Sequence, residues 1–78
     1  MASIILDVIV DDVDVHEYAA DMASLYDLEV TVLKEHGPAG GWPEIKFEGR
    51  RKRVEAYCRV YAGHDAQEIE DLFAMIKD

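Results

Sequence analysis

The stretch Arg50-Arg-Lys-Arg-Val-Glu-Ala-Tyr-Cys-Arg-Val-Tyr-Ala62 fits two kinds of secondary structure, and the choice between them sets the order of elements in the chain. Helical spacing places Val54, Tyr57, Cys58 and Tyr61 on one face, whereas strand spacing places Val54, Ala56, Cys58 and Val60 on one face. The basic residues at its start oppose a helix dipole. However, the stretch is long for a strand, and Glu55 lies four residues before Arg59, a favourable helical pair. We therefore predict a helix and keep a strand as the alternative.

Before this stretch, residues 3–11 predict a strand and the residues after Asp14 predict a helix. Residues 3–11 are rich in β-branched side chains that alternate between two faces, one of them fully apolar: Ile4, Leu6, Val8 and Val10. Asp14 is followed three residues later by Glu17, which resembles the capping box at a helix start. Apolar residues then recur at helical spacing, so we expect this helix to end near Tyr26.

A hairpin and a final helix complete the expected order. Residues 29–36 and 44–48 alternate as strands do, and residues 37–43, rich in glycine and proline, predict a turn between them. Asp65 precedes a last helix whose apolar stripe is Ile69, Leu72, Phe73 and Ile76. We expect one α+β domain over residues 1–78, with a small antiparallel or mixed sheet covered by helices in the order β-α-β-β-α-α. The strand alternative for residues 50–62 would change this order to β-α-β-β-β-α.

The chain is strongly acidic, and its charges are unevenly distributed. The net charge is −9, and residues 1–33 hold eight acidic residues without a single Lys or Arg. Residues 34–63 are basic in balance, largely through the run Arg50–Arg53, and the last residues are acidic again. Phosphates dominate binding to nucleic acids, and the net negative charge of the chain repels them, so direct nucleic-acid binding is disfavoured. Arg50–Arg53 should form a solvated helix end or pair with the acidic helices, and a nucleic-acid binder that uses this run and Trp42 is the third hypothesis. The excess of carboxylates favours a partner with a basic surface.

The sequence has the features of a cytoplasmic protein. Its single cysteine, Cys58, cannot form a disulfide within the chain, as is usual in a reducing compartment. Residues 1–12 carry acids where a secretory signal carries Lys or Arg, and the apolar run Ile4–Val10 is too short to span a bilayer. We therefore expect a cytoplasmic location and no membrane partner.

No arrangement of residues in the sequence points to catalysis or to a cofactor. Asp11, Asp12 and Asp14 lie near His16 but lack the ligand spacing of a calcium loop, so we interpret them as a strand end and a helix cap. The glycines of residues 37–41 lack the Lys-Ser/Thr of a phosphate-binding loop. Cys58 lies on an apolar face in either interpretation, as a core residue does. We expect a protein that is not an enzyme and that holds no cofactor or metal.

Six residues are candidates for binding a partner: Asp11, Asp12, Asp14, Glu17, Asp21 and Trp42. The acids would form a negative face that either binds a basic surface or only keeps the protein soluble. Trp42 lies between glycine and proline at the expected hairpin tip, where it is an exposed anchor or folds back over the small core. A second hypothesis is a homodimeric structural or regulatory module, because a chain this short is marginally stable alone.

The C-terminal part of the sequence resembles small proteins of tailed bacteriophages. The run Pro43-Glu-Ile-Lys-Phe-Glu-Gly49, a charged helix-like piece, Tyr61-Ala-Gly-His-Asp65 and a short acidic helix carry this resemblance, which covers residues 42–78. Such phage proteins include inhibitors of host enzymes and anti-CRISPR proteins, many of them acidic and non-catalytic. The resemblance implies an inhibitor in the host cytoplasm that mimics nucleic acid and occupies a nucleic-acid-binding surface of a host protein. It carries over no individual functional residue.

Overall fold

Three strands and three helices follow one another in the described residues, which are 1–10, 14–36 and 41–78 of a computed structural model. The elements are β1 (Ala2–Asp7), α1 (Val15–Tyr26), β2 (Glu29–Lys34), β3 (Glu44–Gly49), α2 (Arg51–Tyr61) and α3 (Ala66–Met75). The α+β class and the order β-α-β-β-α-α are confirmed. The stretch that fitted two kinds of structure forms a helix, α2.

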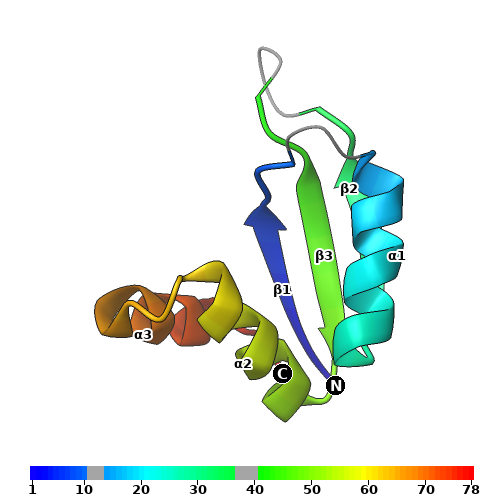
Figure 1. Cartoon of the computed structure of the whole chain (residues 1–78). Helices are drawn as coiled ribbons and strands as arrows, with labels where there is room; N and C mark the ends of the chain where they lie inside the picture. The colour runs from blue at the N-terminus through cyan, green and yellow to red at the C-terminus, as the bar shows by residue number, and fades with distance from the viewer. Residues whose placement is uncertain (11–13, 37–40) are drawn as a thin grey trace.

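The strands form an antiparallel sheet in the order β1-β3-β2, so the last strand of the sequence lies in the middle. β2 and β3 are the predicted hairpin, and β1 pairs with the other side of β3. α1 and α2 lie on one face of the sheet: α1 packs against β2, and α2 packs against β1 and β3 (Figure 1). α3 lies beyond β1, next to α2. Side chains such as Ile5 and Thr31, which point to the opposite face, are exposed.

The core forms between α2 and the strand residues that point toward it. Ile45 and Phe47 of β3 have no exposed surface, as their alternation predicted. The Phe47 ring stacks on Tyr57 of α2, with ring centroids 4.1 Å apart. The buried residues of α2 are Val54, Tyr57 and Cys58, which lie on one helical face. Val60, which the strand pattern would bury, is 54% exposed, so the helical pattern is the one that matches the core.

The first two strands are shorter than predicted, and the cause is the same for both. β1 ends at Asp7 instead of residue 11, and β2 ends at Lys34 instead of residue 36. Asp7 and Lys34 both pair with Glu44, the first residue of β3, so neither strand finds a partner beyond it. After Asp7, the Val8 N–H still donates to the Pro43 carbonyl at 3.0 Å. Residue 11 itself lies outside the described residues.

The basic run at the start of α2 pairs with acidic side chains. Arg51 contacts Glu55 one turn later at 3.0 Å and Asp78 at 2.7 Å. Arg53 contacts Asp27, the residue that ends α1, at 2.6 Å. These carboxylates offset the unfavourable positive charge at a helix N-terminus. The ion pairs tie α2 to α1 and to the C-terminal residues, as the sequence predicted for a run that pairs with the acidic helices.

Asp14 caps α1, as its spacing to Glu17 predicted. Its carboxylate accepts hydrogen bonds from the backbone N–H groups of His16 (2.8 Å) and Glu17 (3.4 Å). Replacing Asp14 by alanine should lower the free energy of unfolding, measured in urea, by about 1 kcal/mol. Asp21→Ala is the matched control because it removes the same charge without a cap, and its effect should stay within about 0.5 kcal/mol. Equal losses in the two variants would contradict the capping role.

Candidate functional site

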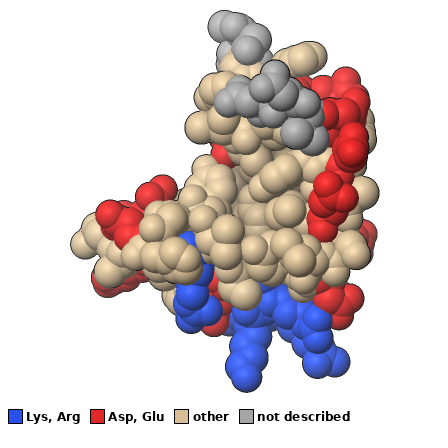
Figure 2. All heavy atoms as spheres, viewed as in Figure 1, with Lys and Arg blue, Asp and Glu red and all other residues tan. Residues whose placement is uncertain are grey.

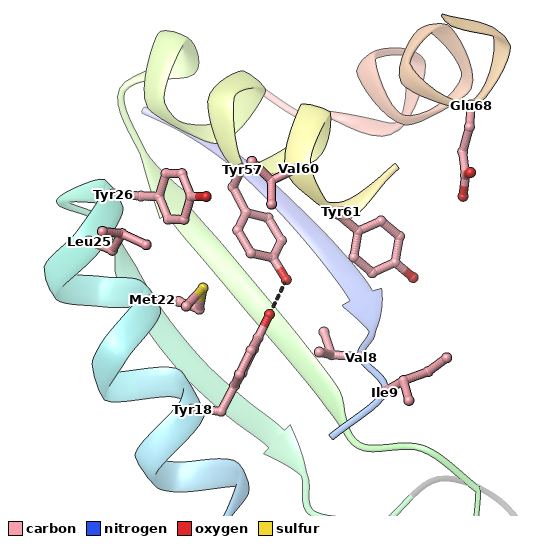
Figure 3. Close-up of a pocket in the computed structure, with 10 residues that line it drawn as sticks. All are labelled: Val8, Ile9, Tyr18, Met22, Leu25, Tyr26, Tyr57, Val60, Tyr61 and Glu68. Atoms are coloured by element: carbon pink, nitrogen blue, oxygen red, sulfur yellow. Dashed lines mark hydrogen bonds between the residues drawn. The ribbon is translucent and has the colours of Figure 1, made fainter. Parts of the chain in front are cut away.

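A groove with a volume of about 570 Å³ opens between α1 and α2 on the helix-bearing side of the sheet (Figure 3). Every residue that lines it is apolar or aromatic except Glu68. The lining includes all four tyrosines of the chain: Tyr18, Tyr26, Tyr57 and Tyr61. The first two belong to α1 and the last two to α2, so the packing of two distant segments on one sheet assembles the groove.

The tyrosine rings hold one another in place. The hydroxyls of Tyr18 and Tyr57 form a hydrogen bond of 2.8 Å across the groove (Figure 3). The Tyr26 ring meets Tyr57 edge-on, with centroids 5.5 Å apart. The Tyr61 hydroxyl donates to the backbone carbonyl of Asp7 at 2.7 Å. These contacts among the protein's own residues fix the shape of the groove, and small binding sites are usually pre-formed in this way.

The two phenols of α2 are neutral at physiological pH. Burial raises the pKa of Tyr57, and the hydrogen bond to Tyr18 raises it further. Burial also raises the pKa of Tyr61, and the negative charge of Asp7 adds to the shift. A general base needs a pKa near the working pH, so neither phenol is suited to that role. The half-buried Tyr61 offers aromatic surface to a ligand, whereas the buried Tyr57 supports the groove from below.

Exposed apolar side chains surround the groove. Leu25 of α1 is 70% exposed, Ile9 after β1 is 63% exposed, and Val60 of α2 is 54% exposed. All three line the groove. Single exposed apolar residues are common on proteins, but their clustering around a concave aromatic surface makes this groove a candidate binding site.

The charges around the groove are arranged in separate patches. Figure 2 shows acidic side chains along the α1 side of the molecule and over α3, with uncharged surface between them. Basic side chains gather at the end of the molecule where α2 starts. The acids of α1 are Glu17 and Asp21, and those of α3 are Glu68, Glu70 and Asp71. The apolar groove therefore lies between two acidic helices.

The predicted acidic face is only partly described. Asp14, Glu17 and Asp21 are exposed, and Glu17 and Asp21 lie on the side of α1 opposite its buried Ala19. The carboxylate of Asp14 is occupied by the helix cap. Asp11 and Asp12 lie outside the described residues. The described part of this face therefore consists of Glu17 and Asp21, which project outward beside the groove.

Trp42 lies against the start of α1, away from the four tyrosines. Its side chain is 48% exposed, so it is neither fully exposed nor folded into the core. It lines a second hollow of about 360 Å³ together with Asp14 and His16. The His16 ring is 2.5 Å from Glu35, and this hydrogen bond raises the pKa of the imidazole. The structure thus brings Trp42 to Asp14, but not to Asp21.

Sequence reasoning missed the groove as a site. Its tyrosines belong to the apolar stripes of the helices α1 and α2, a pattern that predicts packing residues. One signal was available: every tyrosine of the chain lies in these two segments. The exposure of Val60 agrees with the helical pattern, which leaves it off the apolar face of α2. The exposure of Leu25 had no such signal, because it belongs to the apolar stripe of α1.

Cys58 is expected to be unreactive in the folded protein. The side chain has no exposed surface, and burial raises the pKa of the thiol from 9.0 to about 11. A shift of this size lowers the thiolate fraction at neutral pH by about 100-fold, and the thiolate is the reactive form. A disulfide reagent at about pH 8 should therefore react at least about 100-fold more slowly with native protein than with protein in guanidinium. Similar rates in the two states would contradict this burial.

The same pKa shift has a consequence for stability. Because the folded state holds the thiol proton more tightly, the contribution is fully present below the unfolded pKa of 9.0 and is lost as the pH rises through about 11.

The described residues contain no group of three or more His, Cys, Asp or Glu side chains arranged to hold a metal ion. No family model matches the chain, and comparisons with curated proteins and with solved structures find no match. None of the helices in the described ranges has the length and apolarity needed to cross a membrane.

Proposed function

We propose that the protein is a non-catalytic binding module that holds a segment of a partner protein in the four-tyrosine groove. The observation that carries this proposal is the gathering of all four tyrosines with exposed Ile9, Leu25 and Val60 around one concave surface. Tyrosine is enriched among the residues that contribute most to protein–protein binding. The apolar lining fits apolar side chains of the partner, and the hydroxyls of the half-buried Tyr18, Tyr26 and Tyr61 keep lone pairs that can accept hydrogen bonds from its backbone.

The partner segment should be basic as well as apolar. The groove lies between the acids of α1 and those of α3, and the whole chain has a net charge of −9. Lys and Arg side chains flanking the apolar anchors would meet these carboxylates. Glu17 and Asp21 would contact such a surface directly, and Asp11, Asp12, Asp14 and Trp42 are the further candidates near the start of α1.

This chemistry supports an inhibitory role. Basic surfaces of proteins often bind nucleic acids, whose phosphates they neutralise. A module that covers such a surface with carboxylates would compete with the nucleic acid, as the resemblance to phage inhibitors, including anti-CRISPR proteins, also implies. The proposed partner is accordingly a host protein with a basic, nucleic-acid-binding surface in the cytoplasm.

Selection from a displayed library of random peptides of about 15 residues tests the proposal without assuming a partner. We expect the selected peptides to combine Leu, Phe or Trp with Lys or Arg, and their affinity to fall as salt is raised. Selection of acidic or purely polar peptides would contradict the proposed chemistry. A peptide affinity that does not change with salt would contradict the proposal that the carboxylates of α1 and α3 attract the partner.

A further inference from the structure

The two outer edges of the sheet differ in how they are covered. At the β1 edge, the Ser3 N–H donates to the Lys77 carbonyl at 2.7 Å, and the Lys77 N–H donates to the Ser3 carbonyl at 2.8 Å. The Tyr61 hydroxyl covers the Asp7 carbonyl on the same strand. Proteins commonly protect edge strands in this way, because unpaired backbone groups invite pairing with another chain.

The β2 edge has no such cover among the described residues. Backbone groups of an antiparallel strand point alternately to its two sides. The backbone groups of Ser3 point away from β3, toward Lys77, and the registers of β1 and β2 on β3 carry this alternation over to β2. The backbone N–H and C=O groups of Glu29 and Thr31 therefore point toward β3, and those of Val30 and Val32 point away from it. Neither Val30 nor Val32 has an outward backbone hydrogen bond to any part of residues 1–10, 14–36 or 41–78.

We propose that β2 of one molecule pairs with β2 of a second copy, antiparallel about a two-fold axis at Thr31. Val30 of each copy then exchanges backbone hydrogen bonds with Val32 of the other, and the two sheets become one continuous sheet. Thr31 meets Thr31 of the second copy on the open face, a favourable cross-strand pair.

The charges on β2 favour this self-pairing. The strand starts with Glu29 and ends with Lys34. In this register Glu29 of each copy lies opposite Leu33 of the other, one position away from Lys34 of that copy. A register centred on Val32 would instead place Glu29, a strand residue, opposite Glu35 of the second copy, which like charges disfavour. The register at Thr31 places Glu35 opposite Asp27, and both of these residues lie outside the strand. In the register at Thr31, residues 29–33 pair with one another and Lys34 lies opposite Leu28, whereas a register centred on Val30 pairs only residues 29–31 within the strand.

Helix α1 leaves room for the second copy. Its groove-facing side carries large side chains, including Tyr18, Met22 and Leu25 (Figure 3). By helical spacing, Ala20 and Ser24 lie toward the other side together with Glu17, so the second α1 would approach two small side chains and one carboxylate. The groove stays open in this arrangement, and dimerisation does not depend on the proposed function.

Sedimentation equilibrium of the full chain tests the proposal through Val30→Pro. Proline removes the outward N–H of Val30 without breaking a bond to β3, as is tolerated on edge strands. We expect the dimer dissociation constant to rise about tenfold or more relative to Val30→Ala, which loses similar packing but keeps the N–H. Because each copy carries a net charge of −9, the wild-type dimer should strengthen between about 0.05 and 0.5 M NaCl.

A charge exchange keeps the proposal testable if Val30→Pro does not fold. Glu29→Lys alone should weaken the dimer, and Glu29→Lys with Lys34→Glu should restore it. A monomer up to roughly 1 mM in high salt, equal affinities of Val30→Pro and Val30→Ala, or no rescue by the double exchange would overturn the proposal. The groove variant Leu25→Asp should dimerise as the wild type does. Failure of peptide binding in the groove can therefore be distinguished from failure of dimerisation through β2.

Discussion

Replacing Phe47 by alanine should lower the free energy of unfolding by about 3–5 kcal/mol. The ring has no exposed surface and stacks on Tyr57, so its removal leaves a cavity between β3 and α2. A domain of this size has a total stability of only about 4–12 kcal/mol. We therefore expect a large fall in the melting temperature, measured by circular dichroism during thermal unfolding.

Phe73→Ala is the matched control, since it deletes the same ring from a less buried position. Phe73 lies on α3 at the edge of the core, where the Arg59 guanidinium sits 5.2 Å from its centroid. Partial exposure should limit its loss to roughly half that of Phe47→Ala or less. If the two variants lost the same stability, the core would not be centred on β3 and α2.

Replacing Leu25 by aspartate should weaken binding of the selected peptides by about tenfold or more. The side chain is 70% exposed on the groove rim, so an apolar contact is lost and a charge is placed where the partner's apolar anchors dock. Peptide affinity measured by calorimetry, together with the melting temperature of each variant, checks this expectation.

Met75→Asp is the control that separates binding from stability. Met75 is 51% exposed in the last turn of α3, as Leu25 is in the last turn of α1, and it does not line the groove. Both substitutions place an acid near a helix C-terminus and should cost similar, small amounts of stability. Equal affinities of the two variants for the peptides would show that the groove is not the binding surface.

Local patterns of the sequence predicted most of the fold. The alternation of Ile45 and Phe47 and the cap at Asp14 were sufficient to place β3 and α1. For α2, the stripe formed by Val54, Tyr57 and Cys58 outweighed the competing strand pattern. The predicted ends of β1 and β2 were wrong because they depend on a residue distant in the sequence. Both strands have Glu44 of β3 as their last pairing partner.

The candidate site was less predictable for a physical reason. Charge can be counted along a sequence, so Glu17 and Asp21 were identified correctly as an exposed acidic face on α1. A groove depends on how far two helices are separated on a sheet, and this separation has no local signal. Leu25 belongs to the apolar stripe of α1, and only the tertiary arrangement leaves it exposed.

The most direct test of the proposed function is a nuclear magnetic resonance titration of isotope-labelled protein with a selected basic peptide. We predict that the largest shifts occur at residues of the groove, such as Met22, Leu25 and Val60, and that Val30 and Val32 of β2 change little. Shifts confined to β2 or to the open face of the sheet would contradict the assignment of the groove as the binding site.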